Sequence, residues 1–180
     1  MKKFWIQVIA LIVVIFGALF FYVNPSIWQK ALSPNSPSPS DMSNLKKLEI
    51  IDPTNPDNPP KTVINIELAK TADQRSKGLG FRQSLSSDSG MLFLYDTPTK
   101  LTFWMKGMNF PLDFIWILDD TIVDLLPNIP NPPANFPDSE LPIYSSQAKI
   151  NKVLEVNSGF IAAHNIKVGD KIKINDNSAH

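Results

Sequence analysis

The sequence predicts a mainly β domain of the α+β class: a small antiparallel, barrel-like sheet with one or two short helices, behind an N-terminal transmembrane helix. Three observations support this prediction. Residues 62–68 alternate between two faces, which is the period of a half-buried strand. Short apolar runs separated by turn residues recur through residues 90–126 and 152–174. A long apolar run stands at the N-terminus.

The N-terminal run, residues 4–23, contains Gln7 as its only strongly polar side chain. About 20 residues, at about 1.5 Å each, suffice to cross a hydrocarbon core of about 30 Å. Lys2 and Lys3 precede the run, and Lys30 is the one cation close behind it. This bias in positive charge predicts a single-pass membrane protein whose N-terminus is cytoplasmic and whose remaining chain is extracytoplasmic.

A cleaved signal peptide is the alternative interpretation of the same run. Residues 31–33 have the small-x-small form of a cleavage site, but they lie far beyond the apolar run and Pro34 follows directly. The apolar part of a signal peptide is also shorter, at about 7 to 15 residues. We therefore favour the uncleaved anchor; both interpretations export the domain.

The composition divides the chain into four parts. Residues 1–23 are the predicted anchor, and residues 24–60, rich in Pro, Ser and Asn, are a predicted extended linker. The predicted globular domain covers residues 61–176, and residues 177–180 are a tail. Within the linker, residues 45–51 are apolar enough to form an edge strand that docks on the domain, and this point is left open.

The first half of the domain combines the strand at 62–68 with a short helix and three more strands. Thr71 and Gln74 have the spacing of a capping box that opens a helix, and Gly78 is suited to end it. Strands are predicted at residues 90–95, 101–105 and 112–118. In the last of these, Asp113 is the lone polar residue on its face.

The second half begins with a tight turn at Asp119-Asp120 that leads into a strand at 121–126. A loop at 127–142 follows and carries six prolines. Residues 152–156 are predicted as a strand, and Ser158 is predicted to cap a short helix that continues through His164. A turn at 168–171 then introduces a closing strand that ends at Ile174.

Charge and cysteine content exclude several classes of function. Seventeen basic and seventeen acidic residues balance, and the lysines are scattered, so we expect no nucleic-acid partner. The chain has no cysteine, which excludes disulfides, a thiolate nucleophile, a lipid-modified cysteine and the usual zinc sites. There is no serine-nucleophile motif. There is also no glycine-rich phosphate loop, and no cofactor is predicted.

A set of separated motifs spans almost the whole domain. They are Glu67-Leu68-Ala69, Arg75 with Gly78-Leu79, Phe81-Arg82 with Leu85, Gly90-Met91-Leu92-Phe93, Phe103-Trp104-Met105-Lys106, Pro111-Leu112-Asp113, Val153-Leu154-Glu155-Val156-Asn157 with Gly159, and Gly169-Asp170. In order and spacing they resemble the prokaryotic family called domain of unknown function 192. The resemblance implies a small β-barrel-like domain, often exported, with no established activity, substrate or cofactor.

Three positions depart from the pattern of that family. Gly80 stands where Met is usual, and Gly107-Met108 stands where Asn-Thr is usual after Trp-Met-Lys. If the amide and hydroxyl at those last two positions contact a ligand in relatives, that contact is missing in this chain.

Trp104 and Lys106 are the first candidates for ligand binding. Strand alternation places them on one face and Phe103 with Met105 on the other. A Trp beside a Lys is suited to the rim of a binding site, while the competing interpretation makes Trp104 a core residue.

Asp113 and Glu155 are weak candidates for a catalytic carboxylate pair, the minimum for acid/base hydrolysis of a glycosidic bond. The competing interpretation is structural: Arg75 and Arg82 pair with these carboxylates and stabilise the barrel. Arg75, Arg82 and Asp113 also remain candidates for ligand contact.

A copper site formed by Met91, Met105 and Met108 is the one metal site considered. No His or Cys stands near these methionines in the sequence, so we expect them to pack in the core and predict no metal site.

Three functions follow from these observations. The leading hypothesis is a membrane-anchored, non-enzymatic domain that binds a small ligand, glycan or envelope protein near Trp104, Lys106 and the 127–142 loop. The second is a hydrolase that uses Asp113 and Glu155 on an envelope substrate, and the third is a purely structural envelope domain.

Overall fold

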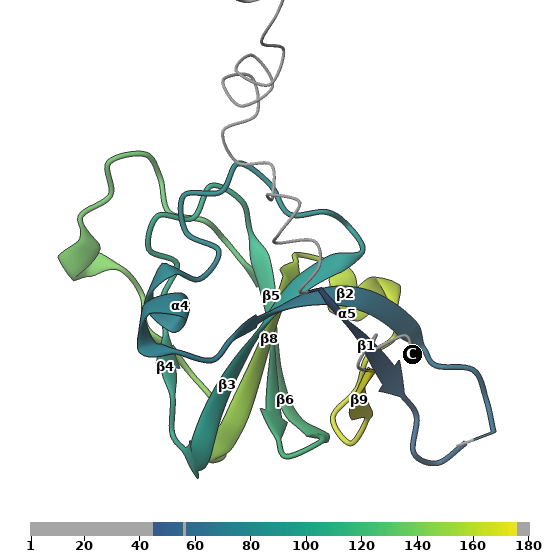
Figure 1. Cartoon of the computed structure of the whole chain (residues 1–180). Coiled ribbons are helices and arrows are strands. Elements are labelled where there is room, and N and C mark those ends of the chain that lie inside the picture. Colours follow the sequence, from purple (N-terminus) through teal and green to yellow (C-terminus); the bar gives the residue numbers. More distant parts are fainter. Residues whose placement is uncertain (1–44, 56, 176–180) are drawn as a thin grey trace, which may run out of the picture. The chain divides into compact units, whose positions relative to one another are not determined.

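The computed structural model describes residues 45–55 and 57–175, and its central feature is a closed barrel of seven strands (Figure 1). Around the barrel the strands follow the order β1-β2-β3-β8-β5-β6-β9. Strands β4 and β7 form a separate two-stranded sheet, and the helices are short. In chain order the elements are β1 (Lys46–Ile51), β2 (Thr62–Ala69), α4 (Ala72–Lys77), β3 (Ser89–Thr99), β4 (Thr102–Phe103), β5 (Leu112–Leu118), β6 (Thr121–Ile129), the 3-10 helix η1 (Asp138–Glu140), β7 (Tyr144–Ser145), β8 (Ile150–Asn157), α5 (Phe160–Ala163) and β9 (Lys171–Asn175).

This architecture confirms the predicted mainly β class and the barrel. The pairings in the barrel are antiparallel except that between β2 and β3, which is parallel. A parallel pair needs a crossover connection, and helix α4 with the turn after it supplies one. The capping box that begins α4 is formed as predicted: Thr71 and Gln74 exchange side-chain to backbone hydrogen bonds, and Gly78 follows the last turn.

Strand β1 belongs to the folded domain, although it lies within residues 24–60, the range assigned to the linker. It pairs with β2 on one side and with β9 on the other, and it thereby closes the barrel. Leu48 and Ile50 point into the interior and are fully buried. The domain therefore begins by Lys46 rather than at residue 61, because removing β1 would open the barrel and expose its core.

Strands β3, β8 and β5 carry apolar side chains on both faces. Inside the barrel, Leu92, Leu154 and Ile115 join one hydrophobic core. Outside it, Phe93, Val153 and Phe114 join a second core, which the β4–β7 sheet and its flanking turns cover. The alternation predicted for residues 112–118 is confirmed, since Leu112, Phe114 and Trp116 face the outer core and Ile115 and Ile117 face the inner one.

The ring of Phe103 lies at the middle of the outer core. It makes edge contacts with Phe93, Phe114 and Trp116, with ring centroids 5.2, 5.8 and 5.6 Å away. The strand that carries it, β4, is only two residues long, so the strand predicted at 101–105 is much shorter than expected. Phe103 and Met105 of this segment pack on the outer face of the barrel wall.

Asp113 replaces Ser158 as the cap of helix α5. Its carboxylate is fully buried and accepts backbone N–H groups from Gly159 at 3.2 Å and Ile161 at 2.9 Å, and from Asn128 at 2.8 Å. Ser158 instead donates its hydroxyl to the side chain of Asn128. The predicted Ser158 cap is therefore wrong, because a carboxylate from the neighbouring strand β5 reaches the same N–H groups.

The predicted 127–142 loop is shorter at its start, because β6 continues to Ile129, and it contains η1. Within residues 45–55 and 57–175, neither helix has the length and apolar composition that crossing a bilayer requires. The span predicted at residues 4–23 lies outside the described part of the chain.

We expect Asp113→Asn to lower the free energy of unfolding by about 2–4 kcal/mol, because an amide offers one oxygen and sets its own N–H groups against backbone N–H groups. Urea unfolding monitored by circular dichroism measures this change. Asp96→Asn is the matched control: this carboxylate is exposed, and its replacement should change stability by less than about 0.5 kcal/mol. Equal losses in the two variants would contradict the capping role of Asp113.

Candidate functional site

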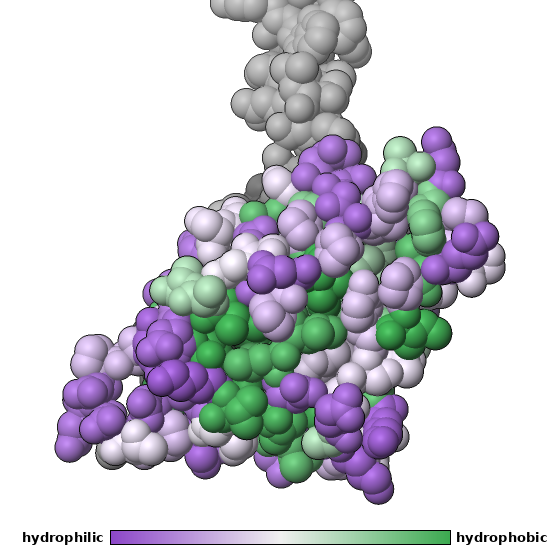
Figure 2. Space-filling view, turned by 180° about the vertical axis from the view of Figure 1, so that it is seen from behind, coloured by the Kyte–Doolittle hydropathy of each residue, from purple (hydrophilic) through white to green (hydrophobic). Residues whose placement is uncertain are grey.

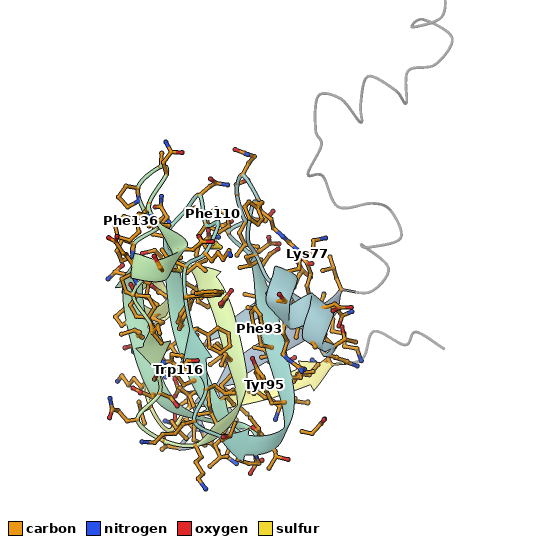
Figure 3. The ribbon with its side chains drawn as sticks, turned by 90° about the vertical axis from the view of Figure 1, so that its left-hand side faces the viewer. Lys77, Phe93, Tyr95, Phe110, Trp116 and Phe136 are labelled. Carbon is orange, nitrogen blue, oxygen red and sulfur yellow. The ribbon has the colours of Figure 1, made fainter. Side chains whose placement is uncertain are left out.

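A cavity of about 370 Å³ lies over the outer face of the barrel wall, on the side that Figure 3 presents. Helix α4 contributes one of its walls, and the turns at residues 79–81 and 104–108 contribute others. Phe93, Phe103 and Leu112 lie in the cavity wall and belong to the outer hydrophobic core. The cavity is therefore lined by rigid core residues on one side and by turn residues on the other. We call it the Glu155 cavity.

Strand alternation places Glu155 in this cavity and Asp113 outside it. On β8, Leu154 and Val156 point into the barrel, so Glu155 between them points outward. In the sheet it pairs with Met91 of β3 and Phe114 of β5, both members of the outer core. Glu155 thus stands in the centre of an apolar wall.

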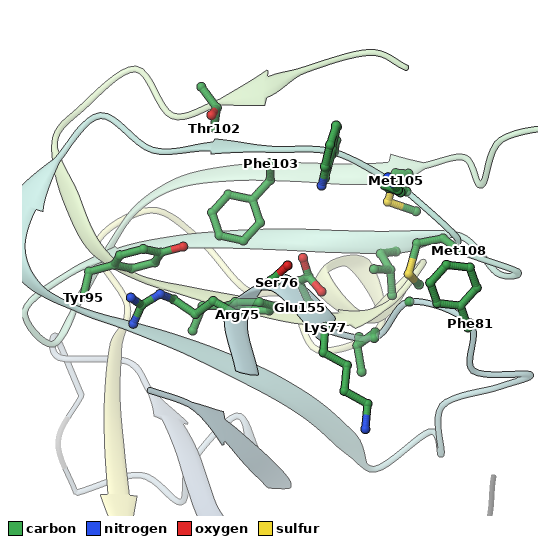
Figure 4. A pocket seen from close by; sticks show the side chains of 16 residues that line it. Arg75, Ser76, Lys77, Phe81, Tyr95, Thr102, Phe103, Met105, Met108 and Glu155 are labelled. Atoms are coloured by element: carbon green, nitrogen blue, oxygen red, sulfur yellow. The ribbon is translucent and has the colours of Figure 1, made fainter. Parts of the chain in front are cut away.

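The Glu155 carboxyl group is buried and receives no hydrogen bond from any residue that the structure describes. The residue is 5% exposed, and since no fully buried side-chain oxygen in the described part of the chain lacks a partner, the carboxyl oxygens keep some access to the cavity. Burial among apolar groups disfavours the charged form and raises the pKa of Glu155 to about 8. At neutral pH the group is therefore largely a neutral acid, which can donate one hydrogen bond into the cavity (Figure 4).

Arg75 and Tyr95 form the polar side of the cavity. The Arg75 guanidinium donates to the backbone carbonyl of Leu94 at 2.9 Å and lies 4.7 Å from the centre of the Tyr95 ring. Burial raises the pKa of Tyr95, Arg75 opposes that rise, and the nearby Glu155 adds to it. Figure 4 shows the Tyr95 hydroxyl turned towards the other lining side chains. Arg75 thus stabilises one wall while Tyr95 presents a neutral hydroxyl.

Trp104 and Lys106 lie at the mouth of the cavity, on the face opposite to Phe103 and Met105, as strand alternation predicts. Trp104 is 52% exposed, and the Lys106 ammonium lies 5.3 Å from the centre of one of its rings. Lys106 also forms an exposed ion pair with Asp138 of η1 at 2.6 Å. A large aromatic surface is therefore available to a ligand at the entrance, and Trp104 is not a core residue.

Phe81 and Gly107 join the two turns that border the cavity. The Phe81 N–H donates to the Gly107 carbonyl at 2.7 Å, and the Phe81 ring, which is 71% exposed, packs on Gly107. A Cβ atom at position 107 would lie 2.8 Å from that ring, and the backbone there has φ of +67°. Glycine at this departure from the family pattern is therefore favoured by the positive φ, and any larger residue would also displace the Phe81 ring.

The structure separates the predicted carboxylate pair. Asp113 faces the barrel interior, where it caps α5, and Glu155 faces the outer cavity, so no catalytic dyad forms. The predicted arginine partners also lie elsewhere. Arg82 forms a two-pronged ion pair with Glu67, at 2.5 and 2.8 Å, and Arg75 contacts backbone carbonyls and Tyr95. Of the five residues predicted to contact a ligand, Trp104, Lys106 and Arg75 line the cavity together with Glu155, and Arg82 and Asp113 do not.

Met91, Met105 and Met108 are buried in the outer core. Among residues 45–55 and 57–175, no three side chains of the His, Cys, Asp and Glu types are grouped to hold a metal ion. Sequence reasoning missed Tyr95, Ser76 and Phe81 as lining residues. Their positions depend on how α4 and the turns fold over the barrel wall, and no local pattern in the sequence marks them.

Exposed apolar surface alone does not mark the site. Figure 2 shows the face opposite to that of Figure 1, where hydrophobic side chains gather in the centre and hydrophilic ones surround them. What distinguishes the Glu155 cavity is a buried ionisable group without a protein partner inside an apolar wall.

We expect the stability of the protein to fall as the pH rises from about 4.5 to above 8, because the folded state binds the Glu155 proton more tightly than the unfolded state does. The free energy of unfolding that comes from the protonated Glu155 is fully present below pH 4.5, the ordinary pKa of a glutamate. It is lost as the pH passes through about 8, the pKa of Glu155 in the folded protein. Its full size is on the order of 5 kcal/mol, since each pKa unit corresponds to about 1.4 kcal/mol.

Urea unfolding of the protein and of Glu155→Gln between pH 4.5 and 9 isolates this contribution. Gln has the same shape and stays neutral, so the stability of the variant relative to the native chain should increase with pH. If the free energies of unfolding of the native chain and the variant change with pH in parallel, Glu155 ionises with an ordinary pKa.

Comparisons with known proteins agree with this fold. The sequence profile of DUF192, described as "Uncharacterized ACR", matches residues 54–174, which is more than half of the chain. A crystal structure of a protein from Sinorhizobium meliloti, proposed to be a transcription regulator, is 28% identical, with a TM-score of 0.62 over 72% of this chain and 93% of that one.

A crystal structure of a protein of unknown function from Novosphingobium aromaticivorans is also 28% identical, with a TM-score of 0.61 over 72% of this chain and 84% of that one. No curated protein matches the sequence. The predicted resemblance is thus confirmed by the profile that covers nearly the whole barrel, and the chain belongs to the family domain of unknown function 192.

Proposed function

We propose that this protein is a membrane-tethered, extracytoplasmic, non-enzymatic domain that binds a small neutral ligand, or one end of a glycan, in the Glu155 cavity. The observation that carries the proposal is the Glu155 carboxyl group: buried, unpartnered among the described residues, and open to a cavity. Burying such a group costs free energy that the domain would avoid with an apolar residue. A ligand that accepts its hydrogen bond offsets this cost.

The lining of the cavity defines the ligand it suits. A neutral Glu155 donates a hydrogen bond, so the ligand needs an acceptor such as a carbonyl, ether or hydroxyl oxygen. Arg75, Lys77 and Lys106 line the same cavity and disfavour cationic ligands. The exposed ring of Trp104 favours a ligand with a flat apolar face. A sugar ring or a similar polar ring meets all three conditions.

Binding is better supported than hydrolysis. Glycosidic hydrolysis ordinarily takes two carboxyl groups on either side of the bond. Among the described residues that line the Glu155 cavity, Glu155 is the only acid, and Asp113 is committed to capping α5 on the other face of the sheet. A purely structural role is less well supported, because Glu155 makes no interaction that would hold the barrel together.

The description of the Sinorhizobium meliloti protein raises DNA binding as an alternative. A DNA-binding domain needs a basic surface, because most of its affinity comes from contacts with phosphates. In this chain seventeen acidic residues balance seventeen basic ones, so DNA binding has little electrostatic support.

Ligand binding can be tested by thermal unfolding of residues 39–180 in the presence of neutral, N-acetylated and acidic sugars, cell-wall fragments, metals and nucleotides. This fragment retains β1, which the barrel requires. A ligand at a hundred times its Kd adds about 2.7 kcal/mol and should raise the unfolding midpoint by roughly 10 °C.

The expected shift disappears in Trp104→Ala and Glu155→Leu, which remove the stacking surface and the hydrogen-bond donor. Val168→Ala is the control, because this exposed side chain does not line the Glu155 cavity, and its shift should equal that of the native fragment. No shift with any compound, or a shift that survives in both site variants, would contradict the proposed cavity.

The tether can be tested by fractionating bacterial cells that produce the full chain. The apolar run at residues 4–23 predicts that the protein sediments with membranes, and that a chain starting at residue 39 does not. Protease added to spheroplasts should degrade the domain, because it lies outside the cytoplasm. A full-length protein in the soluble fraction, or one whose mature N-terminus follows residue 33, would contradict the uncleaved anchor.

A further inference from the structure

The Glu155 cavity is the first of three cavities that share lining residues. A second, of about 460 Å³, shares Phe81, Lys106 and Met108 with it and lies between the Gly107 turn and the loop at 131–138. A third, of about 210 Å³, shares five residues with the second and is lined mainly by proline and aromatic side chains: Asn131, Pro132, Pro133, Phe136 and Leu141 are common to both. We call this series of adjacent cavities the ligand track.

Exposed aromatic rings border the ligand track along its length. Trp104 stands at the Glu155 cavity, Phe81 stands between the first and second cavities, and Phe136 stands between the second and third. They are 52%, 71% and 37% exposed, and they are three of the six large hydrophobic side chains exposed in the described part of the chain. Exposed aromatic side chains gathered around connected cavities are typical of a binding surface rather than of scattered surface residues.

We infer that the ligand is a linear N-acetylated glycan, with its terminal unit in the Glu155 cavity and the following units along the ligand track. This inference rests on the proposed function and specifies its ligand. A single sugar unit would occupy the first cavity alone and leave Phe81 and Phe136 uncovered. A chain of rings covers all three exposed aromatic side chains.

The acetamido group suits the composition of the Glu155 cavity. Its carbonyl oxygen accepts the hydrogen bond that neutral Glu155 donates, and its methyl group suits the apolar wall formed by Phe103, Met108 and Leu112. The acetamido group is uncharged, so it needs no ionic partner. Along the track, Lys106 and Asp138 already neutralise each other across a 2.6 Å ion pair.

A peptide ligand is less well supported. An extended peptide usually pairs with an open strand edge, because its backbone carries a donor and an acceptor at every residue. The parts of β3, β8 and β5 that hold Phe93, Glu155 and Phe114 are paired on both sides within the closed barrel. Strand β4, which also lines the cavity, pairs with β7 alone but is only two residues long, so it offers little edge to an extended peptide.

The test is calorimetric titration of the full chain, held in lipid nanodiscs to avoid sugar-based detergents, with N-acetylglucosamine and its β-1,4-linked oligomers up to the hexasaccharide. We expect the Kd to fall at least about tenfold from the monosaccharide to the hexasaccharide, as more units contact the track. Cello-oligosaccharides of the same lengths carry a hydroxyl in place of the acetamido group and should bind about tenfold more weakly, since they lack the carbonyl that reaches Glu155 and the methyl group that contacts the apolar wall.

Two variants separate the track from the first cavity. Phe136→Ala should reduce the ratio between monosaccharide and hexasaccharide Kd values by about fivefold or more, because it removes a distant stacking surface. Val168→Ala is the control and should leave this ratio unchanged, because Val168 lines none of the three cavities. Thermal unfolding of both variants verifies that they are folded.

The outcomes distinguish the inference from the proposed function. Binding of the monosaccharide that depends on Glu155 but does not strengthen with length would overturn the linear glycan and leave the cavity as the site. Tighter binding of a proline-rich peptide that depends on Phe136 would overturn the glycan in favour of a peptide. If no saccharide, peptide or compound of the thermal panel binds, both the inference and the proposed function are wrong.

Discussion

The wall formed by β3, β8 and β5 is apolar on both faces, and the rest of the domain follows from the need to cover both. Closing the barrel covers the inner face, which explains why β1 must pair with both β2 and β9. The outer face is covered by a different set of segments: the turn after helix α4, which carries Leu79, and the β4–β7 sheet with the turns that flank it. A sheet that is buried on both faces does not show the regular alternation of apolar and polar residues that is typical of a sheet with one exposed face.

The outer cover is incomplete, and its gap is the Glu155 cavity. Short segments such as β4 lack the regular surface needed to fill the space over the wall, so a cavity of about 370 Å³ remains. Glu155 stands in that space at a position where the neighbouring strands supply Met91 and Phe114. An acid placed there lowers the stability of the domain once it ionises, and a buried ionisable group whose pKa is strongly shifted is typical of functional sites.

The loops that surround the cavity contact one another through side-chain and backbone interactions. Phe81 joins the turn after α4 to the Gly107 turn, and the ion pair between Lys106 and Asp138 joins that turn to η1. Arg75 holds α4 against the middle of β3 through the Leu94 carbonyl. These contacts fix the positions of the lining residues carried on the loops, and such preorganisation would lower the entropic cost of the proposed binding.

Local patterns were sufficient to predict much of the fold. The capping box of α4, the alternation of residues 112–118 and the opposite orientations of Trp104 and Phe103 depend on neighbours within a few residues, and the structure has all three. The same patterns placed Asp113 and Glu155 together as a possible pair. They could not show that the two lie on opposite faces of one wall, because that depends on the register between β5 and β8.

The sequence by itself determined the class of the domain, its main strands and its membership of an uncharacterised family, because strand period, turn residues and motif spacing are local properties. The tertiary structure alone decided which acid caps α5 and which faces a cavity, that β1 belongs to the barrel, and that Tyr95, Ser76 and Phe81 line the site with Trp104. These outcomes depend on the closure of the barrel and on the folding of the outer segments over its wall. Both bring together residues that are far apart in the chain, and no local pattern encodes those contacts.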